Sequence, residues 1–243
     1  MRKTCILFFV VCLLSYSWTS FSQIEIDSAE ITSDVPELTD FHEVIFPMWH
    51  DAYPAKDFDA LQRFVPQIKE SVKAINNAKL PGILIDKENV WKSQLNALNM
   101  AAQNYYDAVE RDDNDALLLA AERLHYSFER MTRIIRPSLN EINDFHQTLY
   151  IIYHKLYPDR KFDEIASLAD ALIEKADAIV KFPEDRLKKR LGRKISKYDI
   201  AAKELFDATV ALKDALQGDQ PEKKGEAVEA VHTAYQNLDA VFN

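Results

Sequence analysis

An internal repeat constrains this chain more than any other feature of its sequence. The segment DFHEVIFPMWHDAYPAKDFD at residues 40–59 matches DFHQTLYIIYHKLYPDRKFD at residues 144–163, with an offset of 104 residues. Eight of the twenty positions carry the same residue, namely Asp40, Phe41, His42, His50, Tyr53, Pro54, Phe58 and Asp59. Self-similarity at a fixed spacing indicates duplication of one folding unit. The 243 residues are therefore predicted to hold two related units of about a hundred residues each.

Each unit is predicted to form four helices. In the first unit, apolar residues recur at helical spacing along residues 57–76, and the segments KLPG at 79–82 and DDND at 112–115 interrupt the pattern. Alternating strand patterns are nearly absent. Short connections favour antiparallel neighbours, so we expect an all-α fold made of two up-down-up-down four-helix bundles in tandem. The predicted domains are residues 23–136 and 137–243, and helix kinks at Pro47 and Pro66 are expected in the first unit only.

The first 22 residues are predicted to be a signal peptide. A basic start, MRK, precedes the short apolar run ILFFVVCLL, and the small residues Ser20 and Ser22 favour cleavage between Ser22 and Gln23. Both cysteines of the chain, Cys5 and Cys12, lie in this segment. The mature protein is therefore expected to be periplasmic or secreted, without disulfides and without thiolate metal ligands. No other apolar stretch reaches the length of a membrane span.

Charge and motifs narrow the function classes. The net charge of −9 disfavours nucleic acid as a partner, because phosphate binding needs clustered positive charge. The sequence contains no HExxH, GxSxG or Walker motif, so no enzymatic activity is predicted. It also lacks CxxCH, which excludes covalently attached c-type haem.

All six histidines fall at matched positions of the repeat. They pair as His42 with His146, His50 with His154, and His125 with His232. Neutral imidazole is the commonest metal ligand in proteins, so metal ligation in at least one unit is as well supported as the alternative, a set of packed core histidines inherited by both units.

Counting along the predicted helices places the first and last histidine of each unit at one level. His42 lies eleven residues before Tyr53, where the first helix is expected to end, and His125 lies eleven residues after Asn114, where the fourth is expected to begin. In an up-down bundle these two helix ends lie at the same end of the bundle, so the two histidines are expected at the same distance from it. His146 and His232 give the same counts in the second unit.

A glutamate precedes each fourth-helix histidine by three residues, as in carboxylate-containing metal bundles. The predicted sites are thus His42, His125 and Glu122 in one unit, and His146, His232 and Glu229 in the other. Zn²⁺ or Cu²⁺ suits such ligands.

His50 and His154 are weaker candidates for the same sites. His50 lies eight residues after His42, and His154 lies eight residues after His146, on the first helix of each unit. Eight residues correspond to about 12 Å along the helix axis and a rotation of some 80° around it. One ion cannot easily reach both positions of a straight helix. A structural role at the end of the helix, where a histidine interacts favourably with the helix dipole, is the preferred interpretation.

The third and fourth helices carry a resemblance to a known class of proteins. The segment VWKSQLNALNMAAQNYYDAVERDDNDALLLAAERLH at residues 90–125 combines an aromatic residue, an alanine-rich helix, an acidic turn and a helix with a histidine. In this it resembles the cytochrome b562 and cytochrome c′ class of periplasmic four-helix bundles. The resemblance implies haem b as an alternative ligand. The pairs His42–His125 and His146–His232 would then be the axial ligands.

Three functions therefore remain open from the sequence. The first is a periplasmic binding protein with one transition-metal site per unit. The second is a b-type haem protein in electron transfer or haem carriage. The third is a structural or adaptor protein whose histidines are only packed, and the sequence identifies no protein partner for it.

Overall fold

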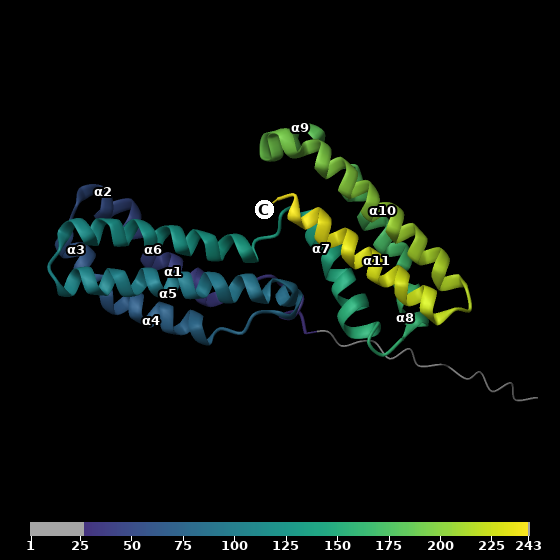
Figure 1. The fold of residues 1–243 in the computed structure, drawn as a ribbon, viewed down its shortest axis with the longest axis horizontal. Helices are drawn as coiled ribbons and strands as arrows, with labels where there is room; N and C mark the ends of the chain where they lie inside the picture. The colour runs from purple at the N-terminus through teal and green to yellow at the C-terminus, as the bar shows by residue number, and fades with distance from the viewer. Residues whose placement is uncertain (1–26, 243) are drawn as a thin grey trace, which may run out of the picture.

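The computed structural model describes residues 27–242, and every regular element among them is helical. The predicted signal peptide, residues 1–22, lies outside the described residues. The helices form two groups, at residues 36–135 and 140–240, which follow each other along the long axis of the molecule (Figure 1). The predicted all-α class is confirmed for this part of the chain. Within it, no helix combines the length and the apolar character needed to cross a membrane.

The first helical group is built from long helices joined by short irregular segments. In chain order it contains α1 (Pro36–Pro47), the π-helical η1 (Met48–Ala52), α2 (Tyr53–Ala55), α3 (Phe58–Arg63), α4 (Val65–Asn77), the 3-10 helix η2 (Gly82–Lys87), α5 (Glu88–Glu110) and α6 (Asn114–Ile135). Aspartates begin two of them. The side chain of Asp57 accepts a hydrogen bond from the Ala60 amide at 2.9 Å, and Asp113 caps α6 in the same way.

The apolar faces of these helices meet in one core. Phe41, Leu61, Tyr105 and Leu124 are fully buried there. Burying a large apolar side chain contributes about 1.5–3 kcal/mol, so the core is the main stabilising feature of the group. The Tyr105 hydroxyl donates a 2.7 Å hydrogen bond to the carbonyl of Leu61, which satisfies its one polar atom inside the core.

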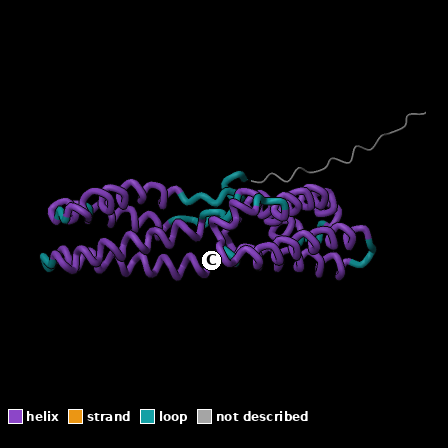
Figure 2. The backbone as a smooth tube through the Cα atoms, turned by 90° about the horizontal axis from the view of Figure 1, so that it is seen from above, coloured by secondary structure: helices purple, strands orange, loops and turns teal. Residues whose placement is uncertain are grey.

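The second helical group has a separate core. Its elements are α7 (Asn140–Tyr150), the π-helical η3 (Ile151–Leu156), α8 (Phe162–Val180), α9 (Glu184–Leu191), the 3-10 helix η4 (Gly192–Lys194), α10 (Ile195–Gln217) and α11 (Pro221–Ala240). Phe145, Leu172, Leu205 and Val231 are fully buried between them. The molecule is elongated, with the two groups end to end and loops gathered at their junction (Figure 2).

The η2 segment carries the contact between the two groups. Ile83 and Leu84, which are almost fully buried, form a small apolar cluster with Tyr150 of the second group. Gly82 permits this approach, because a Cβ atom at that position would overlap the Tyr150 hydroxyl. An ion pair of 3.1 Å between Lys87 and Asp239 adds a polar link between the groups.

A π-helical segment interrupts the first helix of each group at matched positions. It follows Pro47 in the first group, but it also follows Tyr150 in the second, where no proline is present. The expectation that this helix is distorted in the first unit only is therefore wrong. Proline is not the common cause of the distortion, and π-helical turns of this kind are frequent at functional sites.

Candidate metal centre

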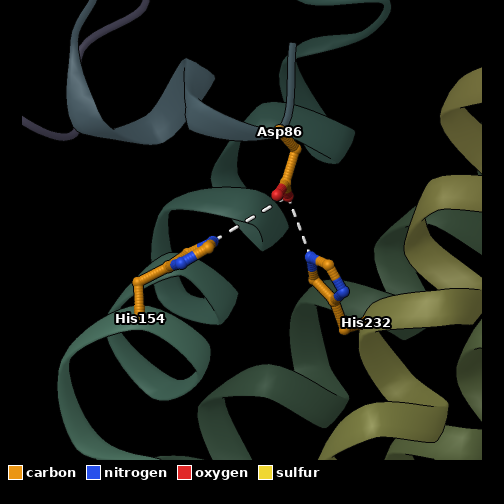
Figure 3. Close-up of side chains that lie close together, drawn as sticks. All are labelled: Asp86, His154 and His232. Carbon is orange, nitrogen blue, oxygen red and sulfur yellow. Dashed lines mark hydrogen bonds and ion pairs between the residues drawn. The ribbon is translucent and has the colours of Figure 1, made fainter. Parts of the chain in front are cut away.

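One cluster of potential metal ligands forms within the described part of the chain. The carboxylate of Asp86 and the imidazoles of His154 and His232 place one donor atom each within 4.8 Å of one another. Figure 3 shows the three side chains converging from separate elements. His232 Nε2 lies 2.8 Å from Asp86 Oδ2, and His154 Nε2 lies 3.8 Å from the same oxygen.

Asp86 is held by the η2 segment at the junction of the two groups. The burial of Ile83 and Leu84 fixes this segment, while the Asp86 side chain stays 28% exposed. The imidazole of His154 nearby and the hydrogen-bonded imidazole of His232 hold the pKa of the Asp86 carboxyl well below its usual range, against the opposing effect of burial. The carboxylate is therefore ionised at neutral pH, which is the form that binds a metal ion.

His232 comes from the middle of α11 and is the most enclosed of the three, with a side chain 9% exposed. The Tyr153 ring stacks on it, with ring centroids 3.7 Å apart and an interplanar angle of 5°. The Tyr153 hydroxyl in turn donates a 2.9 Å hydrogen bond to Glu229 Oε2. These contacts fix the orientation of the imidazole and direct its Nε2 at Asp86.

His154 lies in the π-helical segment η3, where its ring contacts those of Tyr150 and Tyr153. A π-helix makes hydrogen bonds between residues five apart, so each residue turns less about the axis than in an α-helix. Over the six residues of η3 the difference amounts to several tens of degrees. A helical wheel drawn at about 100° per residue therefore gives the wrong direction for the His154 side chain. The smaller rotation of η3 directs this side chain toward Asp86.

The geometry of the cluster is close to that of an occupied metal site. With metal–ligand bonds of about 2.0–2.1 Å at tetrahedral angles, donor atoms lie about 3.3 Å apart. The observed separations of 2.8 and 3.8 Å fall on either side of this value. To bind an ion, Asp86 Oδ2 would shift by about half an ångström relative to each imidazole, and the two imidazole nitrogens, which lie within 4.8 Å of each other, would approach by up to about 1.5 Å. Two imidazoles and one carboxylate would leave at least one coordination position open.

The predicted ligand set of the second unit is arranged differently. His146 stacks on Tyr235, with ring centroids 4.2 Å apart, and does not join the cluster. Glu229 is exposed and accepts the hydrogen bond from Tyr153. Only His232 of the predicted set belongs to the cluster, and His154, the weaker candidate from the sequence, occupies the place expected for His146.

The histidines predicted to lie level are displaced by about one helical turn. The ring of His42 faces that of Phe128, with centroids 5.9 Å apart, and the ring of His146 stacks on that of Tyr235. Each of these aromatic residues follows the fourth-helix histidine of its unit by three positions. Three residues correspond to about 4.5 Å. In the first group, the helix continues through α2, beyond Tyr53, the residue from which the height of His42 along the bundle was counted. Haem ligation by these pairs stays a prediction, with an aromatic ring now found opposite each first-helix histidine.

The predicted first-unit set is not gathered into a site. His42 is half exposed, Glu122 is exposed, and His125 stacks on Trp49 with centroids 4.2 Å apart at 5°. His50 is exposed beside Phe46. The stacked pair of His125 and Trp49 repeats that of His232 and Tyr153, but no carboxylate of the described residues completes a group of three there.

Asp86 is the member of the cluster that sequence reasoning missed. The comparison of the two units could not find it, because the position 104 residues later is Arg190. The available signal was local. An acidic residue directly follows the apolar run ILI between KLPG and the next helix, and a short apolar run in a connection indicates that the connection is packed against something.

Comparison with known proteins adds no further assignment. No family model, curated protein or solved structure matches the chain. The site is therefore interpreted from its own geometry.

Proposed function

We propose that this protein binds one divalent transition-metal ion through Asp86, His154 and His232. The proposal is carried by one observation. Three donor atoms, one each from η2, η3 and α11, lie within 4.8 Å of one another (Figure 3). These elements are far apart in sequence, and they bring together an ionised carboxylate and two oriented imidazoles. The proposal concerns binding and includes no catalytic step.

The donor set favours Zn²⁺ or Cu²⁺. Imidazole nitrogen suits both ions, one carboxylate lowers the charge of the bound ion, and affinity in the divalent series peaks at copper. The described residues contain no cysteine, so thiolate does not compete for the ion. The position of Asp86 in one helical group and of both histidines in the other means that the ion would link the two groups.

We further propose the cellular setting and the origin of the fold. The chain is exported by the signal peptide at residues 1–22, and its two helical groups are duplicated four-helix bundles. The matched π-helical segments and the two matched stacked pairs support the duplication. Mass spectrometry of the protein isolated from the periplasm or medium tests the export, and a mature N-terminus at Gln23 is expected.

Isothermal titration of the chelator-treated mature chain, residues 23–243, tests metal binding. We expect one Zn²⁺ or Cu²⁺ per chain with a Kd below about 0.1 mM. His232→Ala removes one ligand and is expected to raise the Kd at least about tenfold. His125→Ala is the matched control, since it removes an imidazole with the same aromatic stacking from the first group.

Three results would contradict the proposal. The first is the absence of binding at 0.1 mM metal by a folded, monodisperse protein. The second is an equal loss of affinity in His125→Ala and His232→Ala, which would point to general destabilisation or to a site in each unit. The third is an unchanged Kd in His232→Ala, which would assign the metal to other residues.

A further inference from the structure

A cavity of about 190 Å³ lies beside the metal cluster, between the two helical groups. Its wall includes Ile83, Asp86, Lys87, His146, Tyr235 and Asp239. Asp86 thus belongs both to the cavity and to the cluster. One water molecule occupies about 30 Å³ in the liquid, so the cavity has room for a molecule of several non-hydrogen atoms.

His146 is the unusual group in this wall. It is only 7% exposed, and no hydrogen bond joins its ring nitrogens to the described residues. Burial lowers its pKa to about 3, so the imidazole is neutral and presents one N–H donor and one acceptor nitrogen. Tyr106 Oη is the fully enclosed side-chain polar atom without a partner among the described residues, so the ring nitrogens of His146 keep access to the cavity. Polar atoms in such a position are normally hydrogen-bonded, and a molecule in the cavity can supply the bond.

The charges around the cavity depend on the metal. Lys87 and Asp239 form an ion pair with each other, and Asp86 adds one negative charge. With a divalent ion on Asp86, the balance at the cavity becomes positive. A bound ion is the largest local charge in a site of this kind, and three protein ligands leave it a position open to an outside oxygen.

We propose that the metal-loaded protein binds a small oxyanion in this cavity, with the N–H of His146 as a hydrogen-bond donor. The proposal rests on the metal site described above. Carboxylates and inorganic phosphate share the required chemistry, namely negative oxygens that attract the ion and accept from imidazole. Without the metal, two carboxylates face a single ammonium group, so the anion is expected to bind weakly. Binding of the anion therefore requires the metal.

Isothermal titration in two stages tests the inference. The mature chain is first titrated with Zn²⁺, and the loaded protein, freed of excess metal, is then titrated with acetate or with inorganic phosphate. We expect saturable anion binding with a Kd in the millimolar range or tighter. The chelator-treated protein is expected to bind at least about tenfold more weakly, since the charge of the ion is missing. The anion that binds more tightly identifies the source as carboxylate or phosphate.

Substitution of His146 separates this inference from the metal site. His146→Leu keeps an apolar side chain of moderate size and removes the N–H. It is expected to weaken anion binding at least about tenfold while the Kd for Zn²⁺ stays unchanged. His146→Gln restores an N–H donor and is expected to recover part of the binding. His42→Leu changes the matched, half-exposed histidine of the first unit and serves as the control.

The two stages distinguish the possible failures. Absence of Zn²⁺ binding in the first stage contradicts the proposed function itself. Normal Zn²⁺ binding followed by no heat with either anion overturns the oxyanion site alone. Equal anion affinity in the loaded and chelator-treated proteins, or in His146→Leu and the unaltered protein, also overturns it, because both the metal and the imidazole are required.

Discussion

The Tyr153 ring lies parallel to the His232 ring, with their centroids 3.7 Å apart. Tyr153 is itself held by Glu229, which accepts a hydrogen bond from its hydroxyl. Burial, and then this hydrogen bond, raises the pKa of Tyr153 to about 12, so the phenol stays protonated and remains a donor. The stack limits rotation of the imidazole that faces Asp86, as neighbours of metal ligands do in other sites.

Tyr153→Leu is therefore expected to weaken metal binding without removing a ligand. The imidazole gains rotational freedom, and the Kd for Zn²⁺ is expected to rise about tenfold. Tyr153→Phe keeps the stack and should change the Kd much less. Isothermal titration measures both, and Trp49→Leu is the matched control because its stacked partner, His125, lies outside the cluster. Zn²⁺ affinity in Tyr153→Leu equal to that of the unaltered protein would show that the stack does not orient His232.

Gly82→Ala tests whether the position of η2 determines metal affinity. An added Cβ would overlap the hydroxyl of the buried Tyr150 side chain, so η2 or this side chain must move, and a displaced η2 would carry Asp86 with it. We expect a loss of about 1–3 kcal/mol in the free energy of unfolding, typical of overpacking, and a severalfold rise in the Kd for Zn²⁺. Denaturant unfolding and isothermal titration measure the two effects.

Gly218→Ala provides the comparison for this substitution. The nearest atom to a Cβ at Gly218 is a backbone oxygen at 3.4 Å, and the residue lies in the turn between α10 and α11. Its Zn²⁺ affinity is expected to match that of the unaltered protein. The same affinity in Gly82→Ala would mean that Asp86 can reach the histidines from a displaced η2.

The helices and their buried faces could be predicted from the sequence, because both follow from local periodicity. Leu117, Leu124 and Phe128 recur at helical spacing in the sequence, and all three are almost fully buried. The irregular parts could not be predicted in this way. A helical wheel assumes one constant rotation per residue, so it had no means of anticipating η1 or η3.

The candidate site could also be predicted only in part. The repeat identified His232 as a candidate ligand, since a histidine recurs at the matched position of the other unit. It could not identify Asp86, which lies in a segment without a matched acid. It placed His154, which lies in the cluster, behind His146, because the expected rotation was that of a regular helix. Contacts between the two helical groups depend on the fit of particular side chains, such as Gly82 against Tyr150, and no periodicity encodes them.

His146 is expected to make stability depend on pH between about 3 and 6.5. Burial is the main cause of its lowered pKa of about 3, and Lys87 lowers it further, whereas Asp86 acts in the opposite direction. Below pH 6.5 the unfolded chain binds a proton at this residue that the folded protein does not bind. The free energy of unfolding should therefore fall by up to about 1.4 kcal/mol for each pH unit as the pH decreases from 6.5.

Denaturant unfolding of the metal-free protein between pH 7 and pH 4.5 measures this dependence. His146→Leu lacks the titrating group and should show a slope smaller by up to one proton over the same range. Asp86, whose pKa is lowered, affects stability only below its ordinary value of 3.8, outside the range measured. Parallel curves for the two proteins would mean that His146 is protonated in the folded state as readily as in the unfolded chain.

Separating the two helical groups tests the metal site and the domain boundary together. Residues 23–136 and 137–243 each contain a core of their own, so each fragment is expected to be helical and to unfold cooperatively. Neither fragment contains all three ligands, because Asp86 lies in the first and both histidines lie in the second. The second fragment is therefore expected to bind Zn²⁺ at least about tenfold more weakly than the intact chain, and the first is expected to show no comparable affinity. Circular dichroism melting and isothermal titration of each fragment measure these properties. Full Zn²⁺ affinity in the second fragment would place the site within one unit, as the sequence first predicted, and would remove Asp86 from the set of ligands.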